Sequence, residues 1–199
     1  MTAARPDRVP YPAAARSLLR DTVIAAVDEL VRTRGWSATT MADVARAAGV
    51  SRQTLYNEFG SRPALVEAYV AREIDQLVER ATAAVRAEAG DAHRALREAF
   101  RLFLELASDE PVVQIIVADA EAGELYQMLP ALGQALARDR IAALISEVWP
   151  QVGADDAVLL AGTLVRLAIS HALLPTGEPD EVAAGVGRML APFVDQLLA

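Results

Sequence analysis

The chain has 199 residues and a mean hydropathy of +0.23, with no cysteine and only two histidines. Without cysteine, disulfide bonds, thiolate metal sites and thiol redox sensing are excluded. His93 and His171 are too few and too far apart in sequence for a typical metal site, so we expect neither a metal nor another cofactor. The N-terminal residues lack the apolar core of a secretory signal, and we therefore expect a cytoplasmic protein.

The net charge of −8 is distributed unevenly along the chain. Residues 1–62 hold nine arginines and six acidic residues, a net charge of +3. Residues 63–199 hold ten arginines and 21 acidic residues, a net charge of −11. Because proteins bind nucleic acid through positively charged surfaces, a DNA-binding face is expected in the first third of the chain.

Apolar residues recur every three or four positions, which predicts an all-α protein of about nine helices. The first predicted helix covers 14–34 and ends at Gly35. Two short helices over 41–48 and 52–58 follow, and then a long one over 62–87. Further helices are expected near 91–107, 111–118, 121–128, 130–148, 155–174 and 180–198.

The two short helices carry the start signals of a helix-turn-helix unit. Thr40 is placed to cap the first of them, with Asp43 at the third helical position, and Ser51 is placed to cap the second. Gly49 permits the left-handed turn between them. We expect residues 1–62 to form an N-terminal arm and a DNA-binding domain, and residues 63–199 to form a helical ligand-binding and dimerisation domain.

The segment 39–62 resembles the signature of the TetR family of transcriptional regulators, and the resemblance extends over about 16–80. The matching residues are Ala45, Ala48-Gly49-Val50-Ser51, Thr54-Leu55-Tyr56, Phe59 and Arg62. The resemblance implies a homodimer that binds a palindromic DNA operator through the helix-turn-helix and a small molecule through its C-terminal domain. Repression is the commoner mode in this family, and activation by the same fold is the alternative.

Several residues of this segment are candidates for contacting DNA. Arg52 and Gln53 are long donors that can reach phosphates or base edges in the major groove. The family resemblance implies phosphate contacts at Tyr56 and Thr40, and Arg62 is expected to hold the DNA backbone. The full set of candidates is Thr40, Ser51, Arg52, Gln53, Thr54, Tyr56, Asn57 and Arg62.

The chain departs from the family pattern at Asn57 and Glu58, where many members carry an aromatic or basic residue. A carboxylate close to DNA phosphates would be repelled. Glu58 is therefore expected to face away from DNA, to pair with an arginine, or to accept a hydrogen bond from a cytosine amine.

The helix predicted over 155–174 is apolar on nearly all sides. A membrane span is disfavoured because the apolar run is shorter than about 20 residues and because Arg166 lies at its middle. A helix of this kind is buried on both faces. We expect it to form the homodimer interface together with the helix over 180–198, as the last two helices do in the family that the chain resembles.

The ligand site is predicted only from composition. Few charged residues fall on the inner faces of the middle helices, which favours a largely apolar effector, although core packing explains the same residues equally well. The candidates to line a cavity are Phe100, Phe103, Ile115, Ile116, Tyr126, Met128, Trp149, Leu167 and His171.

An enzyme is the main alternative class, and the sequence disfavours it. Gly185-Val186-Gly187 lacks the third glycine and the preceding strand of a dinucleotide-binding loop. Ser170 and His171 are adjacent on a helix and point about 100° apart, so they form no nucleophile–base pair by themselves. A structural DNA-organising protein is also disfavoured, because basic charge would have to cover far more of its surface.

Overall fold

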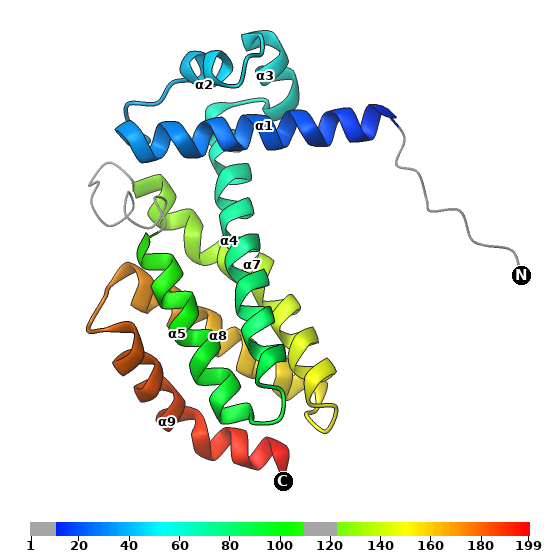
Figure 1. Cartoon of the computed structure of the whole chain (residues 1–199), viewed down its shortest axis with the longest axis vertical. Helices are drawn as coiled ribbons and strands as arrows, with labels where there is room; N and C mark the ends of the chain where they lie inside the picture. The colour runs from blue at the N-terminus through cyan, green and yellow to red at the C-terminus, as the bar shows by residue number, and fades with distance from the viewer. Residues whose placement is uncertain (1–10, 110–122) are drawn as a thin grey trace, which may run out of the picture. The chain divides into compact units, whose positions relative to one another are not determined.

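A computed structural model describes residues 11–109 and 123–199 of the chain. Within these residues every regular element is a helix, which confirms the all-α fold class. Eight helices are described in this part of the chain (Figure 1): α1 (Tyr11–Arg34), α2 (Met41–Ala47), α3 (Arg52–Phe59), α4 (Arg62–Ala87), α5 (Ala92–Asp109), α7 (Gly123–Val148), α8 (Ala154–Leu173) and α9 (Pro179–Leu198).

The chain divides into two compact units, one ending at Tyr69 and the other beginning at Val70. The helix α4 is continuous through this boundary, so its first turns belong to the first unit and the remainder to the second. Each unit has its own buried apolar residues.

The first unit consists of α1, α2, α3 and the start of α4. Its core is formed by one buried face of each helix, including Val27 of α1, Val44 of α2, Leu55 of α3 and Leu65 of α4. These residues have almost no exposed surface, and burying a side chain of this size contributes about 1.5–3 kcal/mol. The short helices α2 and α3 and the first turns of α4 are thereby held against α1.

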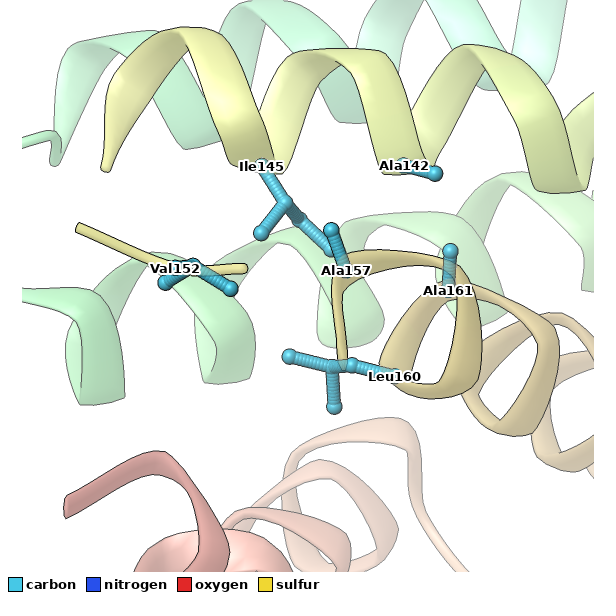
Figure 2. Close-up of a cluster of buried hydrophobic side chains, with 6 residues drawn as sticks. All are labelled: Ala142, Ile145, Val152, Ala157, Leu160 and Ala161. Atoms are coloured by element: carbon cyan, nitrogen blue, oxygen red, sulfur yellow. The ribbon is translucent and has the colours of Figure 1, made fainter. Parts of the chain in front are cut away.

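The second unit contains two closely packed helix pairs, α7 with α8 and α5 with α9. Between α7 and α8, Ile145 reaches toward Ala157, and Val152 lies beside them on the connection between the two helices (Figure 2). Ala142 and Ala161 complete the facing surfaces. Small residues at these positions let the two backbones approach closely.

The structure corrects one prediction of helix boundaries. The helices predicted over 121–128 and 130–148 are one helix, α7 (Gly123–Val148), which continues through Pro130. A proline inside a helix costs about 3 kcal/mol, and the long packed surface between α7 and α8 offsets this cost. The helix predicted over 111–118 lies outside the described residues.

The helix α8 is the one described helix that is long and apolar enough to cross a membrane by length and composition. It has 20 residues, and its apolar run begins only after the two acidic residues of its first turn. Asp155 and Asp156 in its first turn and Arg166 in its middle are costly in a bilayer core. Its inner face packs on α7, as the core helix of a soluble protein does.

Candidate nucleic-acid interface and ligand cavity

The start of α2 is fixed by a reciprocal capping box. Thr40 Oγ1 accepts a hydrogen bond from the backbone N–H of Asp43 at 3.3 Å, and the Asp43 carboxylate accepts one from the backbone N–H of Thr40 at 3.2 Å. The Thr40 hydroxyl also donates to the same carboxylate at 2.6 Å, and this bond is the main reason why the pKa of Asp43 lies below its ordinary value. The predicted cap at Thr40 is confirmed.

The start of α3 is capped in the predicted way by Ser51. Its Oγ accepts a hydrogen bond from the backbone N–H of Thr54 at 3.0 Å and lies 2.8 Å from Thr54 Oγ1. The backbone turns into α3 through Gly49, whose φ of +68° is the left-handed conformation that glycine adopts without strain. The cap and the turn together define where the exposed face of α3 begins.

The exposed face of α3 collects four of the candidate DNA-contacting residues. Arg52, Gln53 and Asn57 are exposed, and Tyr56 has 46% of its surface exposed although it is aromatic. Gln53 Nε2 donates a hydrogen bond to Asn57 Oδ1 at 2.8 Å. Polar donors therefore lie along the outer side of a helix whose inner side is buried.

Glu58 faces α1 and binds two of its arginines, which is one of the three outcomes expected for it. Arg16 Nε donates to both carboxylate oxygens, at 3.0 and 2.8 Å, and Arg20 Nη1 donates to Oε1 at 2.8 Å. Burial raises the pKa of Glu58, but the hydrogen bonds and charges of Arg20 and Arg16 outweigh burial and hold that pKa below its ordinary value. The guanidinium of Arg20 also lies 4.9 Å from the centre of the Phe59 ring. This cluster fixes α3 to α1.

Arg62, at the foot of α4, is engaged with the connection between α1 and α2. It donates to the carbonyl oxygens of Trp36 at 2.9 Å and Thr39 at 3.3 Å, and its guanidinium lies 4.2 Å from the centre of the Trp36 ring. This anchoring role was not predicted from the sequence, although Trp36 was the available signal because arginine stacks well on tryptophan. The contact of Arg62 with the DNA backbone stays a prediction.

The second unit contains a partly open cavity of about 160 Å³ whose wall is contributed by α4, α5, α7, α8 and α9. Nearly all lining side chains are apolar. The exceptions are Glu73, which is buried, Thr82, and Trp149, whose indole N–H donates to the carbonyl oxygen of Ala89 at 3.1 Å. Such a wall favours an apolar ligand.

The cavity brings together only some of the candidate ligand residues. Phe100, Phe103 and Trp149 line it, whereas Leu167 and His171 do not belong to its wall. Leu167 packs against the buried cluster between α5 and α9, and the ring of His171 meets that of Phe100 edge to face, with 6.2 Å between their centres.

The face of α8 that lines the cavity is instead the one that carries Leu164 and Ala168. Because α8 is apolar on nearly all sides, its periodicity does not reveal which face is inward. Of the other candidates, Ile115 and Ile116 lie outside the described residues, and so do the side chains of Tyr126 and Met128.

No cluster of three or more histidine, aspartate or glutamate side chains that could hold a metal occurs in the described part of the chain.

Comparison with known families identifies both halves of the chain. Residues 23–69 match the model described as "Bacterial regulatory proteins, tetR family", and residues 91–192 match "Bacterial Tetracyclin repressor, C-terminal domain". The chain belongs to the TetR family. It is therefore a transcriptional regulator with a helix-turn-helix, and the expectation that it is not an enzyme is confirmed, since this family consists of regulators.

Individual TetR-family relatives support the same assignment. The chain is 38% identical to the HTH-type transcriptional regulator AlkX of Mycobacterium tuberculosis, over 98% of this chain and 94% of that protein. The crystal structure of the TetR family repressor AlkX from a Dietzia species, implicated in biodegradation of n-alkanes, has a TM-score of 0.73 at 33% identity and covers 90% of this chain and 97% of that one.

A more distant TetR-family structure shows the likeness of the fold alone. The Thermus thermophilus transcriptional repressor FadR, in complex with lauroyl-CoA, has a TM-score of 0.57 at 23% identity. The match covers 86% of this chain and 93% of that one.

Proposed function

We propose that this regulator is a homodimeric repressor that binds a palindromic operator and is released from it by a largely apolar small molecule. The observation that carries the proposal is the cavity in the second unit, which lies between five helices and is lined almost wholly by apolar side chains. Repression is supported by the AlkX relative from Dietzia, which is a TetR family repressor.

The shape of the cavity wall supports a ligand with a long aliphatic chain. One face of α4 lines the cavity from Val70 to Val85. At 1.5 Å per residue this face is about 22 Å long, which suits an extended alkyl chain better than a compact ring. The implication of the Dietzia AlkX in biodegradation of n-alkanes supports the same ligand class for this chain.

The homodimer is proposed to form through α8 and α9. Val158 and Leu159 on α8 are 43% and 56% exposed, and Met189 on α9 is 59% exposed. Exposed large apolar side chains on both helices support burial of these helices against a second copy of the chain. A symmetric dimer places two copies of α3 about 34 Å apart, or a multiple of this, for two half-sites.

The DNA contacts are proposed to come from α3 and the caps around it. Arg52, Gln53 and Asn57 face the bases or the nearest phosphates, and Tyr56 offers its hydroxyl to the backbone. Thr40, Ser51 and Thr54 lie at the N-termini of α2 and α3, where helix dipoles favour phosphate, and Arg62 completes the set.

The helix α4 is proposed to carry the signal between the two units. It lines the cavity over several turns and continues into the helix-turn-helix unit without a break. A ligand weakens DNA binding only by its differential affinity for two states of the protein, typically worth about 1–3 kcal/mol. By reciprocity, operator DNA weakens ligand binding by the same factor.

The test measures release of operator DNA by compounds with linear alkyl chains, using the full chain and two matched variants. Ala81 lines the cavity, whereas Ala83, two positions along the same helix, is exposed and does not. Ala81→Trp fills the cavity and is expected to abolish release while leaving operator binding in place, and Ala83→Trp is expected to behave as the wild type. Ligand binding that is equally tight with and without operator would refute the proposal.

A further inference from the structure

Gln53 and Asn57 occupy the side of α3 opposite its buried residues. Successive residues of a helix are about 100° apart, so Gln53 and Asn57 lie one turn apart on the same line. Leu55 and Phe59 form the opposite, buried line. A helix placed in the major groove with Leu55 and Phe59 toward its own protein core turns Gln53 and Asn57 directly toward the base edges.

The two side chains are joined to each other. Gln53 Nε2 donates to Asn57 Oδ1 at 2.8 Å, which restricts the rotamers of both exposed side chains before any DNA is bound. Each amide carries one carbonyl oxygen and two N–H donors. Gln53 Oε1, the second N–H of Gln53 and both N–H groups of Asn57 lie outside this bond, so the pair can offer an acceptor beside a donor. Exchanging the two atoms of both amides leaves the same combination.

We propose that the Gln53–Asn57 pair reads a single adenine in each half-site, as one unit. The proposal rests on the operator binding proposed above and names the base that this part of α3 selects. In the major groove adenine presents an acceptor, N7, beside a donor, the N6 amine. Asn57 Nδ2 donates to N7, and Gln53 Oε1 accepts from N6.

The other bases present the wrong combination. Guanine offers two acceptors, N7 and O6, and therefore leaves Gln53 Oε1 facing another oxygen. Cytosine offers only a donor, and thymine an acceptor beside a methyl group. A bidentate contact of this type discriminates against a wrong base by roughly 5- to 150-fold. We therefore expect an A·T pair at one position of each half-site, selected within this range.

The experiment selects binding sites for the full-length dimer from randomised DNA and then measures affinities for operators that differ at one position. Gln53→Ala and Asn57→Ala are each expected to remove most of the adenine preference at the same position. The double variant is expected to lose no more than either single variant. Tyr56→Phe is the control on the same helix, and it should weaken binding to all sequences equally.

Asn57→Asp is the variant that best distinguishes base reading from a structural role of the pair. The aspartate still accepts the hydrogen bond from Gln53 Nε2, but its outward group is now an acceptor. The preferred base at this position should therefore change from adenine to cytosine, the base that offers only a donor. A purely structural role for the pair predicts no change of base.

The outcomes separate this inference from the proposed function. If the wild-type protein selects no sequence, the proposed operator binding fails. If it selects an operator in which the two alanine variants act at different positions, have additive effects, or leave adenine preferred, the paired readout is overturned while operator binding stands.

Discussion

Replacing Glu58 with glutamine tests whether the ion cluster between α3 and α1 holds the helix-turn-helix together. The Glu58 side chain is only 9% exposed and accepts hydrogen bonds from two arginines. Hydrogen bonds to charged groups contribute about 1.5–3 kcal/mol and neutral ones about 0.5–1.5 kcal/mol. Solvent screens Arg16 and Arg20, which are 66% and 43% exposed, so Glu58→Gln should lower the free energy of unfolding of the first unit by about 1–2 kcal/mol.

The effect has a defined pH dependence. The pKa of Glu58 in the folded protein lies below its ordinary value of 4.5. A group whose pKa is lowered by folding stabilises the protein fully above its unfolded pKa, and this stabilisation is lost as the pH falls through the folded value. The difference between wild type and Glu58→Gln should therefore be constant above about pH 5.5 and should shrink as the pH falls below 4.5.

The assay is urea unfolding monitored by the fluorescence of Trp36, with Trp149→Phe in every variant so that only the first unit reports. The matched control is Arg46→Gln, which removes the charge from an ion pair with Asp43 in the same unit, at 3.5 Å, whose arginine side chain is 78% exposed. It should change stability by less than about 0.5 kcal/mol. Equal effects of the two variants, or a loss for Glu58→Gln that does not change with pH, would refute the assignment of the stabilising charge to Glu58.

Three further predictions concern the contacts of Arg62, the DNA contact of Tyr56 and the dimer interface. Arg62→Ala should destabilise the first unit by about 1–3 kcal/mol, because the carbonyl oxygens it binds lose their donor and the stack on Trp36 is lost. If urea unfolding is unchanged, Arg62 has no anchoring role and remains only a candidate DNA contact. Tyr56→Phe should weaken operator binding in a gel-shift titration without altering stability, and unchanged affinity would remove its hydroxyl from the DNA contacts. Leu159→Glu should place an unpaired charge in the proposed α8 interface and yield monomers in light scattering, whereas Leu18→Glu, at a leucine of α1 that is also largely exposed, should leave the dimer intact. A dimer that survives Leu159→Glu would place the interface elsewhere.

Local features were predictable because their causes lie within a few residues of each other. Thr40 and Ser51 cap their helices as expected, since a capping side chain meets a backbone N–H three positions away. Gly49 adopts the left-handed turn for the same kind of local reason. The helix-turn-helix and its exposed candidate residues follow from these signals.

Features that depend on distant residues were not predictable. The carboxylate of Glu58 binds arginines 38 and 42 positions earlier, and no sequence rule selects this outcome among the three expected for it. The pairing of α7 with α8 carries a helix through Pro130, where the local pattern predicted a break. Leu167 was chosen for the cavity instead of Leu164, because an apolar helix gives no sign of which neighbour covers which face.

The ion pairs of the first unit also affect how strongly salt weakens DNA binding by this regulator. The first 62 residues contain nine arginines, but in the described residues five of them already face three carboxylates. These five are Arg16, Arg20, Arg32, Arg34 and Arg46. An arginine that keeps its carboxylate displaces few counterions from DNA, whereas each phosphate that is truly neutralised adds about 0.9 to the slope of log K against log salt. DNA binding by this regulator should therefore weaken less with salt than its arginine count suggests, which would leave the proposed effector, rather than ionic strength, to control its release.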